Sequence, residues 1–245
     1  MFKYIYNDLK KNKILYYITA ILFLFSFIAV KPNLENSIIE NIANSLSNEK
    51  LLFLCFFEIS IFITYYINNY FSQNYILKIR YLDKTEYIKI ICKINFKFQT
   101  LLLFLLLIIV IIFQNIFSYQ TYNIEIIYQL EVLNIIYLLY KILQILFLIL
   151  ILSKILILLL NANKEKLSFI LVMFFLFSNL INFYLTEVDL TRFSLLIGNS
   201  ILNTYTYSSF FINSIDYLFH LLIFIIVERV INYVFYNKEK FKQFK

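Results

Sequence analysis

Residues 98–117 read FQTLLLFLLLIIVIIFQNIF and contain no acidic or basic side chain. A helix needs about 20 apolar residues to cross the hydrocarbon core of a bilayer, so this stretch has the length of one membrane span. Five further apolar stretches have comparable length, and the whole chain is 62% hydrophobic with one Gly and one Pro. The sequence therefore predicts an all-α polytopic membrane protein whose single transmembrane domain covers residues 1–245. The six predicted spans are 14–30, 51–71, 98–117, 133–160, 167–185 and 217–236.

Lysine and arginine are concentrated in every second connection between these spans and at both ends of the chain. Basic residues favour the cytoplasmic side of a membrane, so this distribution predicts that both termini are cytoplasmic, as an even number of spans requires. Outside the spans, the opposite side retains only Lys31, Lys50 and Arg192. Of the 22 basic residues, 18 lie on the predicted cytoplasmic side: Lys3, Lys10, Lys11, Lys13, Lys78, Arg80, Lys84, Lys89, Lys93, Lys97, Lys154, Lys164, Lys166, Arg229, Lys238, Lys240, Lys242 and Lys245.

Three segments outside the spans have their own apolar pattern. Apolar residues recur at helical spacing within 2–9, which predicts an N-terminal interfacial helix in the headgroup plane; a frayed basic tail is the alternative. Residues 34–49 carry one apolar stripe and predict a small helix on the outer surface. Residues 186–216 include a short apolar run around Gly198 that is too polar to cross, which makes this a possible re-entrant outer segment. The first span is followed by no small-x-small cleavage pattern, so it is expected to remain as a helix.

Several catalytic classes lack the residues they need. A phosphate-cradling loop requires several glycines, and Gly198 is the only glycine in the chain. A zinc site of the HExxH kind requires two histidines, and His220 is the only one. Cys55 and Cys92 fall at different depths and predict no disulfide framework. We therefore expect no catalytic residues, no metal site and no cofactor in this chain.

Ionisable residues inside spans are costly in hydrocarbon and are usually retained for a reason. Glu58 and Lys141 fall about 10 Å and about 12 Å from the outer boundary at 1.5 Å per residue. Tyr65 shares a helical face with Glu58, and Gln144 shares one with Lys141. These four residues therefore predict either an intramembrane pair between Glu58 and Lys141 or a lined substrate path; an ion pair with a purely structural role is the alternative.

The basic connection before the third span has its own helical signal. Asp83 precedes Glu86 by three residues, in the order of a capping box, so a helix is expected to begin near Lys84 and to continue toward the third span. The charges of this connection also enforce the orientation of the chain, and that role alone is the alternative to binding a partner protein.

The layout as a whole resembles the ABC type-2 transporter permease, and within that family the small permeases of bacterial peptide and bacteriocin export or immunity systems. Locally, the first cytoplasmic connection, residues 75–97, and the closing stretch 231–241, INYVFYNKEKF, are similar to that group. The resemblance covers the whole chain by topology, whereas its local motifs are short. The chain departs from the family in having few glycines and prolines in its spans.

The resemblance implies a permease in the bacterial plasma membrane that exports a hydrophobic or amphipathic substrate, in particular an antimicrobial peptide. It implies separate P-loop ATPase subunits that bind ATP and Mg, and a second permease copy or homologue. The alternative is a non-transporting membrane immunity or scaffold protein; no nucleic acid partner is expected, because the basic residues adjoin lipid. The positions that the resemblance assigns to ATPase coupling are Tyr81, Asp83, Lys84, Thr85, Glu86 and Tyr87.

Overall fold

The computed structural model describes residues 2–30, 38–46, 48, 51–74, 84–119, 132–174 and 207–237. Within these residues the chain is helical and contains no strand. The elements are α1 (Phe2–Lys11), α2 (Ile14–Ala29), α3 (Ile38–Leu46), the π-helical segment η1 (Leu52–Phe57), α5 (Glu58–Gln73), α7 (Lys84–Tyr119), α9 (Val132–Asn161), a helix over 165–174, α12 (Tyr207–Asn232) and the π-helical segment η3 (Tyr233–Asn237).

Among the described residues, three helices are long and apolar enough to cross a membrane, over Thr85–Phe117, Ile135–Asn161 and Tyr217–Phe235. A fourth is present if α1 and α2, which are bent by 77° relative to each other, count as one span. The predicted span 51–71 is instead divided between η1 and the 16-residue α5. Residues 175–185 of the predicted span 167–185 and residues 186–206 of the possible re-entrant segment 186–216 lie outside the described residues, whereas 207–216 belong to α12. The membrane character of the chain therefore depends on three to four of the six expected helices.

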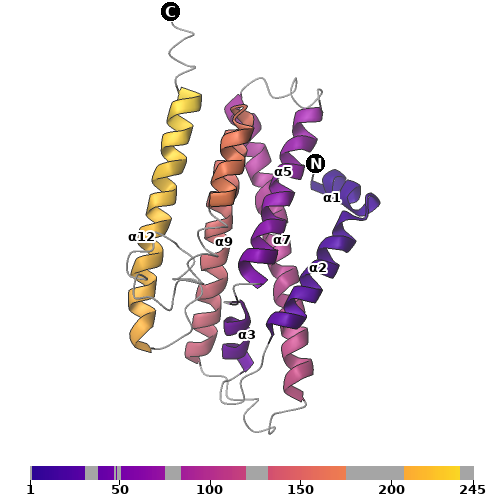
Figure 1. Ribbon diagram of the computed structural model, residues 1–245, viewed down its shortest axis with the longest axis vertical. Helices are drawn as coiled ribbons and strands as arrows, with labels where there is room; N and C mark the ends of the chain where they lie inside the picture. The colour runs from indigo at the N-terminus through magenta and orange to yellow at the C-terminus, as the bar shows by residue number, and fades with distance from the viewer. Residues whose placement is uncertain are drawn as a thin grey trace, which may run out of the picture.

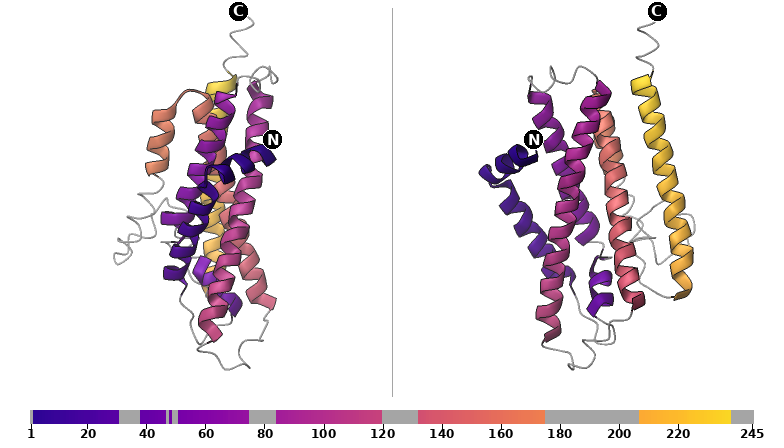
Figure 2. Two further views of the ribbon diagram at one scale, coloured as in Figure 1. Left: turned by 90° about the vertical axis from the view of Figure 1, so that its right-hand side faces the viewer. Right: turned by 180° about the vertical axis from the view of Figure 1, so that it is seen from behind.

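α9 is the central helix, and α12 and α2 lie at opposite edges of the bundle (Figures 1 and 2). α9 packs against α3, α5, α7 and α12. Within an 18-residue apolar stretch of each helix, the share of residues buried by protein is 61% in α9, 33% in α7 and 6% in α12. Most of the described apolar side chains of α12 are therefore exposed or only partly buried by protein.

The turn after α9 has a specific chemical cause. Asn163 adopts a left-handed conformation with φ 58°, which asparagine tolerates better than most residues. The N–H of Lys164 donates to the carbonyl of Leu159 at 3.0 Å, and the N–H of Asn163 donates to the carbonyl of Leu160 at 3.1 Å. These are the two hydrogen bonds of a Schellman motif, which ends α9 and allows the helix 165–174 to return beside it.

α1 is amphipathic, as its sequence predicts, and its apolar face packs on the bundle. Ile5 and Leu9 are fully buried, and the ring of Phe2 lies 4.5 Å from the ring of Phe98 in α7. Asp8 accepts a hydrogen bond from the hydroxyl of Tyr66 in α5. The bend after α1 thus places this helix across the bundle (Figure 1), close to the residue at which the third apolar stretch begins.

α3 differs from the expected surface helix. Its apolar stripe is present, but Asn41 and Ser45 are also buried, because α3 inserts between α7 and α9. The side chain of Gln114 in α7 donates to the carbonyl of Asn41 at 3.1 Å and to the hydroxyl of Ser45 at 2.8 Å. An apolar stripe alone does not distinguish a membrane surface from a protein surface, and here it packs on protein.

A buried polar network joins α5 to α7. Gln99 donates to the carbonyl of Ser60 at 2.9 Å and to the hydroxyl of Thr64 at 3.2 Å. Thr64 in turn donates to the side-chain oxygen of Asn95 at 3.2 Å. All four residues are at most 3% exposed. Lipid offers these groups no hydrogen-bond partner, so their bonds fix how α5 and α7 face each other.

We predict that Gln99→Met lowers the free energy of unfolding by about 0.6 to 1.7 kcal/mol, the range of interhelical hydrogen bonds in membranes. Thr100→Val is the matched control, because the hydroxyl of Thr100 is exposed and bonds only to the carbonyl of Phe96 in its own helix. The measurement is unfolding of both variants in mild detergent. Equal stability of the two variants would show that the network does not hold α5 against α7.

Candidate functional site

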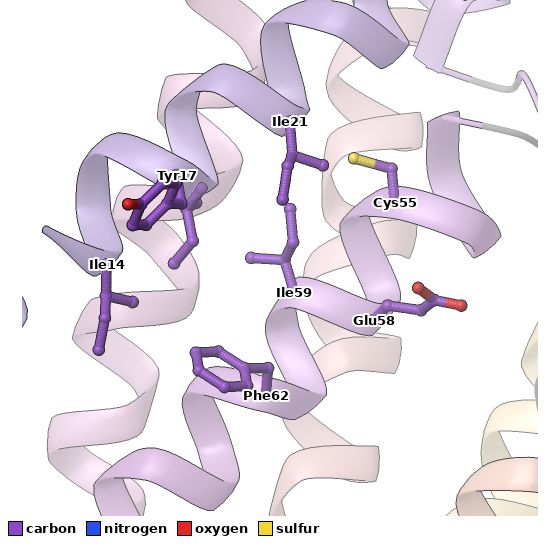
Figure 3. A pocket seen from close by; sticks show the side chains of 8 residues that line it. Ile14, Tyr17, Ile21, Cys55, Glu58, Ile59 and Phe62 are labelled. Carbon is purple, nitrogen blue, oxygen red and sulfur yellow. The ribbon is translucent and has the colours of Figure 1, made fainter.

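A groove of about 410 Å³ lies between α2 and the segment formed by η1 and α5. Figure 3 shows that its two walls come from these two helices, with Cys55 and Glu58 at one side of the group. Its lining is apolar except for Tyr17, Cys55 and Glu58. The residues that line it are Ile14, Tyr17, Ile18, Ile21, Cys55, Glu58, Ile59 and Phe62.

The groove opens sideways from the bundle. Tyr17 is 64% exposed and Phe62 49% exposed, whereas Cys55 at the inner wall is 1% exposed. Among the described lining residues, Glu58 is the only charged one, and its side chain is exposed. The groove therefore combines an apolar surface with one carboxylate, a combination that suits an amphipathic molecule with a positive group.

The carboxylate lies directly after the π-helical segment η1. The backbone N–H of Glu58 donates to the carbonyl of Cys55 as the helix changes to regular α-helical geometry. π-Helical turns are rare and are frequent at functional sites, because the wider turn re-aims the side chains around it. Cys55 and Glu58 are three residues apart and both line the groove, and Figure 3 shows the carboxylate at its edge, directed away from the other labelled side chains.

The other expected path residues lie elsewhere. Lys141 and Gln144 are buried in α9, at 3% and 1% exposure. The ammonium of Lys141 lies 5.6 Å from the ring centroid of Tyr137, within the range of a cation–π contact. The backbone carbonyl of Gln144 accepts a hydrogen bond from the hydroxyl of Tyr217 at 2.8 Å, which ties α9 to α12. The side-chain amide of Gln144 has no hydrogen-bond partner within the part of the chain that the structure describes.

The four residues expected to form a pair or path therefore occupy three places. Glu58 faces the groove and forms no ion pair with Lys141; both residues lie in the described part of the chain. The hydroxyl of Tyr65 shares a hydrogen bond of 2.6 Å with the hydroxyl of Ser168, which connects α5 to the helix 165–174. Equal depth in the membrane places two residues at one level but does not turn their helix faces toward each other.

An ion pair that sequence reasoning missed joins α9 to α12. The ammonium of Lys154 lies 3.0 Å from the carboxylate of Glu228, whose side chain is 6% exposed. The guanidinium Nε of Arg229 lies 3.8 Å from the other carboxylate oxygen. The sequence carried a usable signal, because Lys154 and Glu228 are opposite charges near the same expected boundary of two spans.

The proposed coupling positions are only partly described. Tyr81 and Asp83 lie outside the described residues, and the side chain of Lys84 is not described. α7 begins at Lys84, where the sequence predicts a helix start, and continues without a break to Tyr119. Thr85 and Glu86 are exposed at the first turn of α7.

Tyr87 has a different environment from Thr85 and Glu86. It is 7% exposed, and its ring packs against Phe71 at the end of α5, with ring centroids 6.0 Å apart and the planes at 78°. Its side chain therefore faces α5 and fastens the start of α7 to that helix. The surface on which a partner protein would act at this turn is formed by Thr85 and Glu86.

No family model, curated protein or solved structure matches this chain. In the described residues no group of three or more His, Cys, Asp or Glu side chains is arranged to hold a metal ion. A function has to be inferred from three features: the groove, the ion pair of Lys154 and Glu228, and the exposed start of α7.

We predict that exchanging the charges of Glu58 and Lys141 gives no rescue. Lys141→Glu alone should destabilise the protein, and adding Glu58→Lys should recover less than about 0.5 kcal/mol, the usual limit for residues that share no contact. The measurement is a double-mutant cycle on unfolding in mild detergent. Mutual rescue would show that the two groups pair.

Lys154→Glu with Glu228→Lys is the matched positive control for that cycle. Glu228 is buried and Lys154 is half-exposed, so each single change should cost more than the ~1 kcal/mol of a surface pair and less than the ~3 to 5 kcal/mol of a fully buried one. The double exchange should recover at least half of the loss, because it rebuilds the pair with reversed signs.

Proposed function

We propose that this chain is the transmembrane subunit of an ABC exporter in a bacterial plasma membrane. It has six spans and cytoplasmic termini, and it pairs with a second permease copy or homologue. Separate P-loop ATPase subunits bind ATP and Mg and supply the energy. Its substrate is a hydrophobic or amphipathic compound, in particular an antimicrobial peptide.

The observation that carries this proposal is the length of α7. Its 36 residues form one helix, which is about 54 Å long at 1.5 Å per residue. The hydrocarbon core of a bilayer is about 30 Å thick, so roughly 20 Å of α7 lies in the headgroup layer and beyond it. The apolar stretch begins at Phe98, where α1 contacts α7. The projecting part is therefore the basic segment 84–97, whose first turn contains Lys84, Thr85, Glu86 and Tyr87, the coupling positions within α7 that the resemblance implies.

α7 is suited to transmit a force from this projecting end. No described residue of α7 is Gly or Pro, and α7 runs without a break, so the helix can move as a rigid body. Tyr87 packs on Phe71, and Gln99 bonds to Ser60 and Thr64, so α7 is joined to α5 at two levels. α5 in turn forms one wall of the groove. These contacts can therefore transmit a movement of the projecting end of α7 to the proposed substrate site.

The groove between α2 and α5 supports an amphipathic substrate. Its opening faces the surroundings of the bundle, where a hydrophobic compound dissolved in the membrane arrives. The apolar walls fit a chain or an aliphatic side chain, and Glu58 fits a positive group at one end. Because Glu58 forms no ion pair with another described residue, its charge is available to a ligand.

A second candidate function is a non-transporting immunity protein. The observation that favours it is the same groove, since a site that opens sideways is also suited to hold a membrane-bound peptide without moving it. The two functions differ in their requirement for an ATPase, which the following experiment measures.

We predict that affinity purification of the full chain in mild detergent recovers a P-loop ATPase. Glu86→Arg should reduce its recovery about tenfold, equivalent to ~1.4 kcal/mol, because the change reverses an exposed charge on the proposed contact surface. Glu165→Arg is the matched control, since Glu165 is exposed at the start of the helix 165–174. Recovery of the chain alone, under conditions that preserve known complexes, would favour the immunity protein.

We predict that Glu58→Gln weakens stimulation of ATP hydrolysis by cationic amphipathic peptides by up to about fivefold, the range of an exposed ion pair. Stimulation by a neutral peptide of similar hydrophobicity should not change. Ile59→Trp fills the groove and should reduce both responses, whereas Ile108→Trp, at an exposed position of α7, should reduce neither. Equal effects of the two tryptophan variants would place the substrate outside the groove.

A further inference from the structure

A second cavity lies at the end of the bundle where α7 begins and where α9 and α12 end. It has a volume of about 440 Å³ and is lined by residues of these three helices. The cavity does not touch the groove between α2 and α5, since the two share no lining residue. The residues that line it are Thr85, Ile88, Lys89, Cys92, Lys154, Leu158 and Asn232.

Two lysines give this cavity its charge. Lys89 is exposed on α7, and the side chain of Lys154 on α9 is 49% exposed. Glu228 forms an ion pair with Lys154 at 3.0 Å from a buried position in α12 and does not itself line the cavity. It therefore holds the ammonium of Lys154 at the cavity wall, and the half-exposed ammonium can still donate hydrogen bonds to a ligand.

Buried apolar side chains also line the cavity. Ile88 and Leu158 are buried and line the cavity beside the lysines. The apolar span of α12 ends at Phe235, less than one turn beyond Asn232. The cavity is therefore at the boundary between hydrocarbon and headgroups, and its wall combines two ammonium groups with apolar side chains.

The surface next to the cavity is one along which lipid chains lie. Protein buries only 6% of the residues in the 18-residue apolar stretch of α12. Ile225 lies seven residues before Asn232, on the same face of α12, and is 41% exposed. A molecule with a headgroup in the cavity can therefore extend its acyl chains along α12.

The geometry points to this cavity as a binding site for an anionic phospholipid, whose phosphate is bound by Lys89 and Lys154 and whose acyl chains lie on α12. Basic pockets between transmembrane helices at the cytoplasmic face are a recognised form of headgroup binding. Lysine binds a phosphate as a point charge and needs no further donor geometry. The bound lipid bridges α7 and α12 at the end that projects from the membrane. The site does not depend on transport or on an ATPase.

The test compares phosphatidylglycerol with phosphatidylcholine of the same acyl chains. Each is added to the full chain in mild detergent, with any subunit that co-purifies, and bound lipid is counted by native mass spectrometry alongside the melting temperature. Phosphatidylglycerol should bind more tightly and raise the melting temperature more, and the difference should shrink as salt increases. Equal binding of the two lipids would overturn the proposal. Equal stabilisation by soluble glycerol phosphate would also overturn it, because the acyl chains would then contribute nothing.

Variants then locate the site. Lys89→Gln should weaken phosphatidylglycerol binding about fivefold, the usual contribution of one lysine at an anionic surface. Lys166→Gln removes the same charge from an exposed lysine on the helix 165–174 that does not line the cavity, and it should have little effect. Equal losses in the two variants would show that binding depends on net charge and not on this cavity.

A second pair of variants separates binding from folding. Lys154→Gln with Glu228→Gln replaces the ion pair by two amides that can still hydrogen bond, so it avoids a lone buried carboxylate. This double variant should keep the melting temperature of the lipid-free protein within a few degrees and should lose the preference for phosphatidylglycerol. A folded double variant that retains the full preference would exclude Lys154 as a ligand.

Discussion

The constraint on which this structure depends is that polar groups within a bilayer must find their partners inside the protein. Among the described helices, α5 forms side-chain hydrogen bonds with the largest number of neighbouring helices. It bonds to α1 through Tyr66, to α7 through Thr64, to α9 through Asn68 and to the helix 165–174 through Tyr65. Apolar contacts between helices gain little over contacts with lipid, so these bonds specify which helix lies beside which. Glu58, Ile59 and Phe62, which line the groove, form none of these bonds.

The same reasoning explains how α12 is positioned although most of its surface is exposed. Its apolar side chains pack as well against lipid as against protein, so they do not fix its rotation. Two polar contacts do so, at opposite ends of the helix. Tyr217 bonds to the carbonyl of Gln144, and Glu228 pairs with Lys154. A rotation or a shift of α12 by one residue would break both contacts at once and leave a carboxylate without its partner.

The sequence predicts where helices begin, and which of their faces are apolar, better than it predicts which helix faces meet. The start of α7 at Lys84 and the amphipathic α1 follow from local patterns, because helix starts and apolar stripes are written in neighbouring residues. Local sequence patterns do not determine which helix faces meet. Glu58 and Lys141 have the same expected depth, yet Glu58 lies in the groove and Lys141 lies buried in α9. α3 shows the same limit, since its stripe fits a membrane surface and a protein surface equally well. The polar residues Asn41 and Ser45 on α3 are the signal that favours protein.

The contacts of α2 explain why the groove is the part of this bundle best suited to change its width. Near its end, Phe23 and Phe27 pack against Phe113 of α7, with ring centroids 4.6 Å and 5.7 Å apart. Its first half lines the groove and is joined to the protein mainly through α1, across a bend at Lys13. Lys13 has φ 59°, a conformation that is costly for a residue with a side chain and therefore depends on the contacts of α1 for its persistence. α5, by contrast, is tied to α7 along its length. The groove therefore lies between α5, which is bonded to α7, and α2, which packs on α7 through aromatic rings near its end.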